Sequence, residues 1–267
     1  MHQVEWEPRD ETPVAPAILL LHGLGSNARY WDRVATHLPG RRVVALDLTP
    51  ERAEDAAMDQ LMGVIGAAIE QLHLDRPVVV GHSWGAGLAL EFVARNPGLA
   101  SGLVFVDGPI DGVARIFSWG EVEAFMQPPL PRYASLADAI AHSRHELGAA
   151  WAEDLEPFVE AGLRRDGDEL VPALTAPVRH RILRDLYDSD PERLWPSVSV
   201  PAAALIAKKS DARISRSTET GMERVAKLAP AVKIERFQTP HDIPLYAPAE
   251  VAREIELIAR QAEAVTA

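Results

Sequence analysis

Residues 78–97 read VVVGHSWGAGLALEFVARNP, and this stretch decides the fold. Its three valines form a short apolar run of β-branched residues, which is typical of a buried strand. The apolar pattern of residues 84–95 has helical spacing and stops before Asn96-Pro97, where a helix is expected to end. A strand that passes into a helix through Gly-His-Ser-Trp-Gly predicts a tight turn with Ser83 at its apex.

The same alternation of strand and helix continues on both sides of this stretch. Short apolar runs alternate with amphipathic segments of helix length, which predicts an α/β fold with a mostly parallel sheet flanked by helices. The expected strands are His2–Trp6, Ile18–Leu21, Val43–Leu46, Val78–Val80, Leu103–Val106, Ala202–Ala207 and Val232–Phe237. Helices of the core are expected at Gln60–Leu72, Trp84–Arg95 and Pro248–Ala262.

Residues 109–196 interrupt the alternation. This segment has no convincing strand, and it contains helical patterns at Trp119–Met126, Leu136–Leu147, Trp151–Arg164 and Val178–Tyr187. We therefore predict a core made of residues 1–108 and 197–267. A helical cap of residues 109–196 is expected to lie across one end of its sheet.

Composition narrows the class of protein. The chain has 267 residues, 47% of them hydrophobic, and a formal net charge of −12, which argues against nucleic acid as a partner. It has no cysteine, so disulfides and thiolate chemistry are excluded. No signal peptide and no apolar run long enough to cross a membrane is apparent. We expect a soluble cytoplasmic protein without a membrane partner, and the sequence does not indicate its oligomeric state.

The turn at residues 81–85 carries a chemical signal. It matches the G-x-S-x-G pattern in the required context, with a strand before it and a helix after it. Glycines at 81 and 85 leave room for a strained turn, and the helix N-terminus favours developing negative charge near the hydroxyl. Ser83 is therefore the predicted nucleophile.

A serine nucleophile needs a base and an acid that orients the base. His241 is the predicted base, because it lies in the loop FQTPHDIPLYAP that follows the last expected strand. Two carboxylates come directly after strands at the same edge of the sheet, Asp211 and Asp107. We favour Asp211 because the acid commonly stands late in the chain order Ser-Asp-His. Asp107 remains the alternative.

The oxyanion that forms during acyl transfer needs backbone donors. One is expected from the N–H of Trp84, the residue after the nucleophile. The second is expected from the glycine-rich loop HGLGS at residues 22–26, where the N–H of Leu24 is the candidate.

Four segments together resemble the α/β-hydrolase superfamily: HGLGSNARYW, GHSWGAG, the Asp211 loop and PHDIPLYAP. The resemblance implies an eight-stranded, mostly parallel sheet with a helical cap after the sixth strand. It also implies a Ser83–His241–Asp211 triad with an oxyanion hole formed by Leu24 and Trp84. The chain departs from the family pattern at its short N-terminus, so the first strand of the family sheet is expected to be missing. The acid loop AKKSDAR also lacks the usual glycine.

The leading hypothesis is a serine hydrolase that cleaves a carboxylic ester, thioester or lactone through an acyl-enzyme. The aspartate nucleophile of epoxide hydrolases and haloalkane dehalogenases is absent at position 83. A lyase or a carbon–carbon bond hydrolase using the same triad is one alternative. A non-catalytic protein that binds a small ligand is the other.

The substrate is expected to be a small molecule with an apolar acyl or ester group, bound partly by the cap. Its exact identity and acyl length stay open. Neither a metal nor a cofactor is implied, because no set of histidines or carboxylates has ligand spacing that competes with the triad. The cap's aromatic and apolar residues could instead form the cap's own core. The candidate substrate contacts are His22, Phe117, Trp119, Phe125, Met126 and Trp151.

Overall fold

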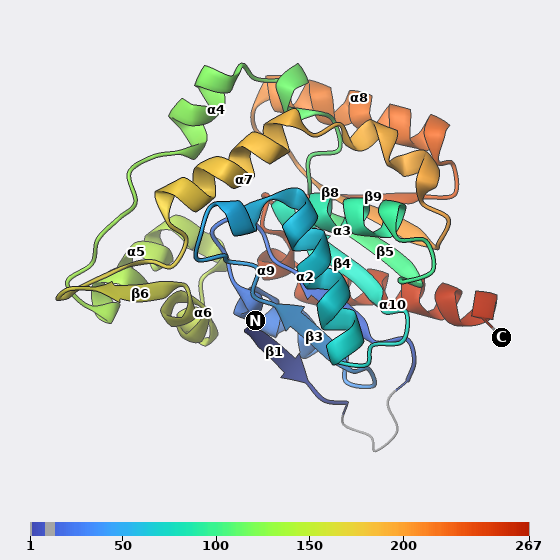
Figure 1. The fold of residues 1–267 in the computed structure, drawn as a ribbon, viewed down its shortest axis with the longest axis horizontal. Coiled ribbons are helices and arrows are strands. Elements are labelled where there is room, and N and C mark those ends of the chain that lie inside the picture. The colour runs from blue at the N-terminus through green and yellow to red at the C-terminus, as the bar shows by residue number, and fades with distance from the viewer. Residues whose placement is uncertain (1, 9–13, 267) are drawn as a thin grey trace.

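A computed structural model describes residues 2–8 and 14–266 and contains a seven-stranded sheet at its centre (Figure 1). The strand order is β1-β3-β2-β4-β5-β8-β9; β1 runs antiparallel to β3 and the other pairs are parallel. The strands are β1 Gln3–Trp6, β2 Ile18–Leu21, β3 Val43–Leu46, β4 Val78–His82, β5 Gly102–Val106, β8 Ala202–Ala207 and β9 Lys233–Phe237. All seven expected strands are present, and the α/β class is confirmed.

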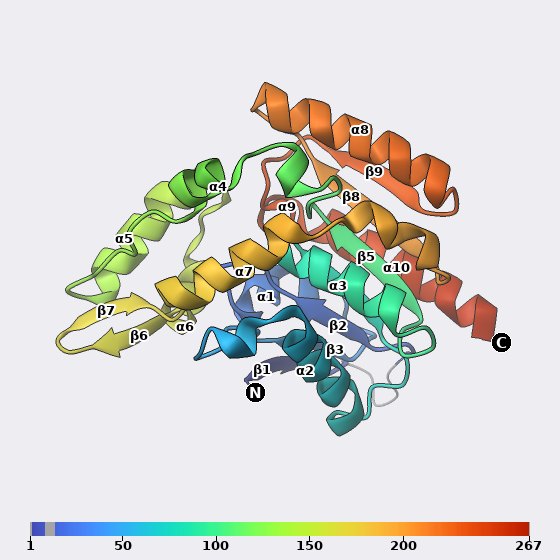
Figure 2. The ribbon, with the colours of Figure 1, turned by 45° about the horizontal axis from the view of Figure 1, so that its top comes forward.

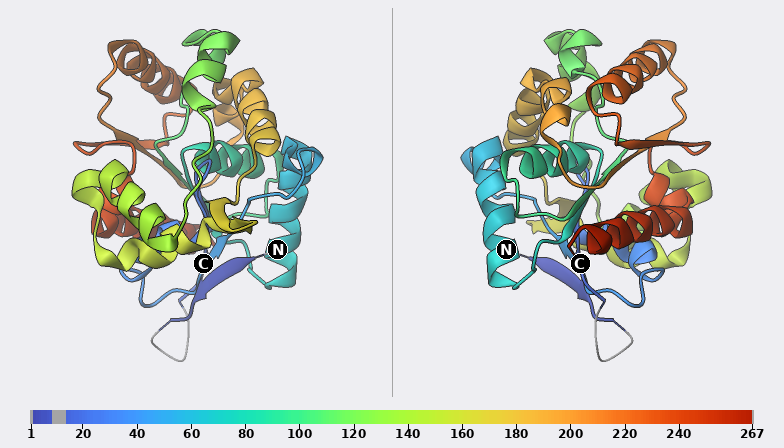
Figure 3. Two further views of the ribbon diagram at one scale, coloured as in Figure 1. Left: turned by 90° about the vertical axis from the view of Figure 1, so that its left-hand side faces the viewer. Right: turned by 90° about the vertical axis from the view of Figure 1, so that its right-hand side faces the viewer.

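Helices cover both faces of this sheet. The views in Figure 3 place α2 and α10 on opposite sides of it. One core cluster joins the sheet to α2, α3 and α8, and the other joins it to α1, α9 and α10. The helices of the core are α1 Asp32–Ala35, α2 Met58–Gln71, α3 Trp84–Arg95, α8 Ala212–Leu228, α9 Ile243–Tyr246 and α10 Pro248–Thr266.

The pleat of the strands explains the continuous apolar runs in the sequence. In β4, Val79 packs into the cluster with α2 and α3, whereas Val78 and Val80 pack into the cluster with α10. Successive side chains of a strand point to opposite faces, so a strand covered on both faces is apolar at every position. The described residues form seven of the eight strands implied by the family resemblance, and β1 is the antiparallel edge strand.

The insertion lies between β5 and β8 and gathers on the left of the molecule in Figures 1 and 2. Its helices are α4 Trp119–Met126, α5 Leu136–Leu147, α6 Glu156–Ala161 and α7 Ala176–Asp188. The expectation of an insertion without strands is wrong, because β6 Leu163–Asp166 and β7 Glu169–Pro172 form an antiparallel hairpin. The hairpin also ends α6 early, so the helix expected to reach Arg164 stops at Ala161.

The two-residue turn of this hairpin is Gly167-Asp168, a pair of residues that is common in such turns. Gly167 has a φ of 64°, a conformation that a hairpin turn requires and that glycine adopts without strain. β6 reads LRRD and is mostly exposed, and β7 reads ELVP and is mostly half-buried, so neither strand shows the apolar alternation that predicts a strand.

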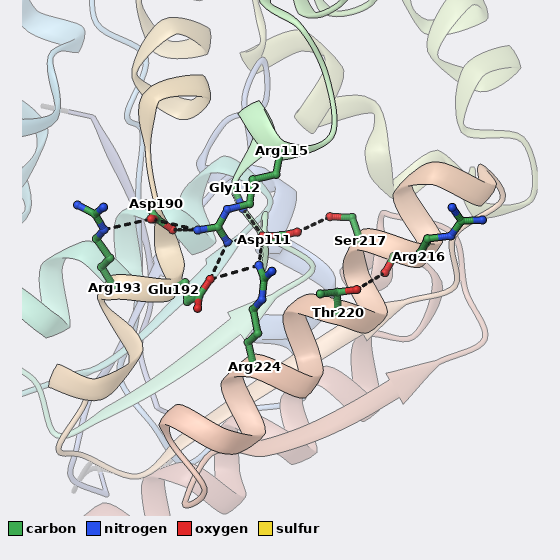
Figure 4. A network of polar contacts seen from close by, with 10 residues as sticks. All are labelled: Asp111, Gly112, Arg115, Asp190, Glu192, Arg193, Arg216, Ser217, Thr220 and Arg224. Atoms are coloured by element: carbon green, nitrogen blue, oxygen red, sulfur yellow. Dashed lines mark hydrogen bonds and ion pairs between the residues drawn. The ribbon is translucent and has the colours of Figure 1, made fainter.

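A cluster of charged side chains ties both ends of the insertion to α8 (Figure 4). The Asp111 carboxylate, 7% exposed, accepts hydrogen bonds from Arg115, Arg224 and Ser217. Arg115 also pairs with Asp190 and Glu192 at the far end of the insertion. Arg224 and Ser217 belong to α8, so this network, the Asp111 cluster, fixes where the chain leaves the core and where it returns.

Candidate active site

Ser83 occupies the sharp turn between β4 and α3. Its backbone has φ 56° and ψ −121°, in the left-handed half of the backbone map that non-glycine residues seldom adopt. The Ser83 N–H donates to the carbonyl oxygen of Val106 on the neighbouring strand, at 2.9 Å. A Cβ at Gly81 would collide with the backbone of Gly85, and one at Gly85 with the backbone before Gly23. Positions 81 and 85 therefore have to be glycine, because any side chain there would collide with neighbouring backbone.

His241 lies directly against the hydroxyl of Ser83. Its Nε2 is 2.9 Å from Ser83 Oγ, and its Nδ1 is 2.6 Å from Oδ2 of Asp107. Asp107 follows β5, the strand next to β4, and its other oxygen accepts the N–H of Ala207 at 2.8 Å. The carboxylate is 1% exposed, whereas the imidazole is half exposed and accessible from the site. The three side chains form a continuous chain from hydroxyl to carboxylate.

Asp211 does not take the place expected for the acid. Its Oδ1 accepts the N–H groups of Arg213 and Ile214, at 2.8 and 2.9 Å, so it is the N-cap of α8. The side chain is exposed, and it is Asp107, the alternative candidate, that contacts His241. Asp directly before a helix is a favoured cap. Because the sequence analysis did not predict α8, it missed this competing role.

Two side chains, His241 and Lys209, stabilise the negative charge of the Asp107 carboxylate. Burial raises the pKa of Asp107, but the hydrogen bond from His241 and the positive charge of Lys209 outweigh it, so its pKa lies below the ordinary value. Lys209 Nζ is 2.5 Å from Asp107 Oδ2. The carboxylate is therefore ionised at neutral pH, as an acid that orients an imidazole must be.

His82, the residue before the candidate nucleophile, supports the loop of His241. Its Nε2 lies 3.0 Å from the backbone carbonyl oxygen of His241, which can only accept, so Nε2 carries the proton. Burial, followed by the charge of His241, lowers the pKa of His82 to about 3, so its ring stays neutral. Its Nδ1 is buried without a partner among the described residues.

Tyr30 holds the same loop from the other side of His82. Its ring stacks on His82 with centroids 4.8 Å apart, and its hydroxyl donates to Asp242 at 3.0 Å. Burial and the neighbouring Asp242 raise the pKa of Tyr30 well above its ordinary value, so the hydroxyl keeps its proton. His82 therefore holds the backbone of His241, and Tyr30 holds the side chain of Asp242, the next residue in the loop. The sequence analysis did not identify this role for Tyr30, because an aromatic in HGLGSNARYW carries no signal beyond packing.

Of the two expected oxyanion donors, Trp84 directly follows the candidate nucleophile, and Leu24 belongs to a loop that approaches it at Gly23. Trp84 is the first residue of α3, where the N–H has no intrahelical acceptor. Within residues 2–8 and 14–266, neither this N–H nor that of Leu24 makes a backbone hydrogen bond. A Cβ at Gly23 would stand 3.2 Å from Cβ of Ser83, which shows how closely the glycine-rich loop approaches the serine.

His22 has a structural role in that loop. It is 1% exposed, its Nε2 accepts the N–H of Leu48 at 2.9 Å, and its Nδ1 donates to the carbonyl of Gly23 at 2.8 Å. Both ring nitrogens are used, so the expectation that His22 contacts substrate is not met. It shapes the loop that carries Leu24.

A cavity of about 710 Å³ opens beside Ser83 and His241. Two of the five expected cap contacts, Phe117 and Met126, line it. The apolar lining comes mainly from the start of the insertion, with one residue each from α7 and α8: Ile110, Val113, Ile116, Phe117, Met126, Leu186 and Ile214. The cavity wall is therefore shared between insertion and core.

The other three expected contacts lie outside the lining of this cavity. Phe125 is 72% exposed on α4. Trp119 packs edge-on against Tyr187, with the guanidinium of Arg184 4.8 Å from its ring centroid. Trp151 packs on the core near α1 and α10, with Arg144 over its ring. For Trp119 the alternative interpretation, packing in the insertion's own core, is correct. Trp151 packs against the core of the sheet and not against that of the insertion.

Within the described part of the chain there is no cluster of three or more histidine, cysteine or carboxylate side chains that could hold a metal. A helix both long and apolar enough to cross a bilayer is likewise missing from residues 2–8 and 14–266.

Residues 18–254 match the family described as "Alpha/beta hydrolase family". The chain is 32% identical over 158 residues to the lipase LipV of Mycobacterium tuberculosis, covering 57% of this chain and 58% of that protein. It is 31% identical over 133 residues to epoxide hydrolase 3 of Xenopus tropicalis, covering 43% and 36% of the two chains. The matches thus span only about a third to three-fifths of these relatives.

Solved structures match over nearly the whole chain. A thioesterase domain from the curacin biosynthetic pathway superposes with a TM-score of 0.77 at 20% identity, covering 95% of this chain and 94% of the other. E-2-(acetamidomethylene)succinate hydrolase gives a TM-score of 0.78 at 17% identity, covering 96% and 99%. At these identities the likeness concerns the fold.

Proposed function

Because the chain belongs to the alpha/beta hydrolase family, we propose that it is a serine hydrolase that cleaves a carboxylic ester, thioester or lactone. The single observation that carries the proposal is the hydrogen-bonded chain from Ser83 through His241 to Asp107, at a strained strand-to-helix turn. A hydroxyl, an imidazole and a buried carboxylate in this order are the parts of a nucleophile activated by a base.

The reaction begins at Ser83 Oγ, which attacks the carbonyl carbon of the substrate. Its proton passes to His241 Nε2, 2.9 Å away. The carbonyl oxygen becomes an oxyanion and takes hydrogen bonds from the N–H groups of Leu24 and Trp84. When the tetrahedral intermediate collapses, the alcohol or thiol leaves with the proton held by His241. Water then repeats the sequence on the acyl-enzyme and releases the acid.

Asp107 has the role of the third group. It fixes the Nδ1 proton of His241, so that Nε2 is the basic nitrogen that faces Ser83. Its carboxylate stabilises the imidazolium that forms after the first proton transfer. Since the carboxylate is 1% exposed, solvent screens this attraction less than it would at the surface.

The cavity beside Ser83 supports an apolar acyl or ester group as substrate. One part of its lining is aliphatic and aromatic, and pockets of this size suit small organic molecules. We assign residues 109–196 the role of a cap, because Phe117 and Met126 of this segment form part of the wall. The epoxide hydrolase relatives do not change the proposal, because opening an epoxide in that class uses an aspartate nucleophile and position 83 is serine.

The test is hydrolysis of p-nitrophenyl esters from C2 to C12 by the wild-type protein and by Ser83→Ala. We expect turnover that disappears in the variant, with a chain-length profile set by the depth of the cavity. A fluorophosphonate probe should label the wild type and leave Ser83→Ala unlabelled. A wild type that neither turns over the esters nor takes the label, or a variant as active as the wild type, would refute the serine mechanism.

A further inference from the structure

Lys209 makes an ion pair inside the candidate triad. It comes two residues after β8, and its Nζ lies 2.5 Å from Oδ2 of Asp107, the same oxygen that contacts His241. The lysine side chain is 18% exposed and the aspartate 1%. With the N–H of Ala207 on Oδ1, the carboxylate has three donors, and two of them can carry a positive charge.

This arrangement changes the electrostatics of the proposed base. In a triad the carboxylate attracts the proton that the imidazole takes up. Here the ammonium group of Lys209 already neutralises the charge of the Asp107 carboxylate. It contacts Oδ2, the same oxygen that the His241 imidazole contacts. Two positive charges that share one buried anion repel each other, since water screens them poorly. A proton on His241 is therefore less favourable than it would be beside Asp107 alone.

The other groups facing His241 do not offset this effect. His82 is neutral and donates to the His241 carbonyl. The carboxylate of Asp242 accepts the hydrogen bond of Tyr30. Lys208 and Asp211, in the loop of Lys209, are exposed and make no ion pair among the described residues. Lys209 is thus the charged partner that Asp107 shares with His241.

We propose that Lys209 is a positioning residue of the triad, which fixes the Asp107 carboxylate and lowers the pH at which His241 is lost as a base. The inference rests on the proposed function, because it concerns the same His241–Asp107 pair. Its chemical consequence is that replacing Lys209 by a neutral residue should strengthen the attraction between Asp107 and a proton on His241.

The test uses three variants of the full-length protein. Lys209→Gln keeps a hydrogen-bond donor to Asp107 but removes the charge, Lys209→Arg keeps the charge, and Lys208→Met removes a charge from the same loop without touching Asp107. Each is compared with the wild type in the pH profile of kcat/KM for the best p-nitrophenyl ester. The protonation midpoint of the His241 ring is followed separately by NMR, with His241→Asn used to assign the signal.

For Lys209→Gln we expect the acid limb of the profile to move up by about 0.5–1 pH unit. One unit below the wild-type limb, this is a further three- to tenfold loss of kcat/KM. The NMR midpoint should move in the same direction, while Lys209→Arg and Lys208→Met stay within about 0.2 unit of the wild type. Thermal melting shows that the variants are folded.

A limb and midpoint unchanged in folded Lys209→Gln would overturn the proposal and leave Lys209 as a purely structural partner of Asp107. An equal movement in Lys208→Met would overturn it too, because the effect would then follow net charge. The NMR measurement needs no turnover, so it decides the question even if Ser83→Ala refutes the hydrolase proposal.

Discussion

The imidazole of His82 hydrogen-bonds the backbone carbonyl oxygen of His241 across 3.0 Å, linking the turn of the candidate nucleophile to the loop of the candidate base. The two rings are also close, with centroids 4.8 Å apart. Because half of the His241 side chain is exposed, its position depends on the loop that carries it. The hydrogen bonds of His82 and Tyr30 hold that loop in place.

Removing this link should lower the rate of the chemical step. We expect His82→Phe to reduce kcat roughly 10–100-fold with little change in KM, because misplacing a catalytic group costs rate more than binding. His82→Gln, whose amide N–H can reach the same carbonyl, should recover most of the loss. Steady-state kinetics on the best ester checks both. A His82→Phe variant with wild-type kcat would show that the loop keeps His241 in position without the hydrogen bond from His82.

The two aspartates considered as the triad acid can be separated by substitution. Asp107→Asn should lower kcat/KM by about 10³–10⁴-fold, since an amide stabilises the wrong tautomer and lacks the charge. Asp211→Ala should change kcat/KM by less than about threefold. As the loss of an N-cap, it should instead reduce the free energy of unfolding by about 1 kcal/mol. Urea denaturation and ester hydrolysis of both variants measure the two effects, and a large rate loss in Asp211→Ala would reverse the assignment.

The sequence predicted these residues unevenly, and the reason is physical. Ser83 and His241 were identified because each lies at the carboxyl end of a strand and has chemistry that the other needs. Asp211 was favoured as the acid because of its place in the chain order, and chain order does not show which carboxylate lies near His241. In the structure β5 is the neighbour of β4, so Asp107 emerges beside Ser83, whereas Asp211 continues into α8 and caps it.

The fold was more predictable than the insertion. Buried strands such as β2 and β8 are apolar at every position, because helices cover both faces of the sheet, and their bounds were predicted exactly. The hairpin of β6 and β7 is held by backbone pairing and an isolated bridge between Tyr133 and Leu170. The four residues of β6 and the four of β7 show no apolar alternation that would predict a strand.

Two glycines near the turn should respond in opposite ways to alanine. At Gly81 a Cβ would collide with the backbone of Gly85, so Gly81→Ala should unfold the turn and abolish labelling of Ser83 by a fluorophosphonate. At Gly87, in α3, a Cβ meets no atom within 4 Å outside the nearby backbone of its own helix. Gly87→Ala should therefore raise the free energy of unfolding by about 0.5–1 kcal/mol, since alanine suits a helix better. Thermal melts and probe labelling compare the pair. A folded, labelled Gly81→Ala would contradict the steric requirement.

The Asp111 cluster should make stability depend on pH. Burial raises the pKa of Asp111, but hydrogen bonds from Ser217 and Arg115 outweigh it, so its folded pKa lies below the ordinary value of 3.8. A carboxylate with a depressed pKa contributes stability that is fully present above the ordinary value and is lost as the pH falls through the folded one. The contribution should therefore be constant near neutrality and decline below about pH 4.

Asp111→Asn should accordingly lower the free energy of unfolding by about 1–2 kcal/mol at pH 7, because it removes the buried charge that Arg115 and Arg224 both contact while leaving them Glu192 as a partner. The difference from the wild type should begin to shrink as the pH falls below about 4, where Asp111 of the unfolded chain takes up a proton while the folded carboxylate still resists it. Asp168→Asn, at the exposed turn of the hairpin, is the matched control and should change stability by less than about 0.5 kcal/mol. Urea unfolding at pH 7 and pH 3.5 measures all three proteins. A loss in Asp111→Asn that stays the same at both values would mean that its shape, and not its charge, holds the insertion to α8.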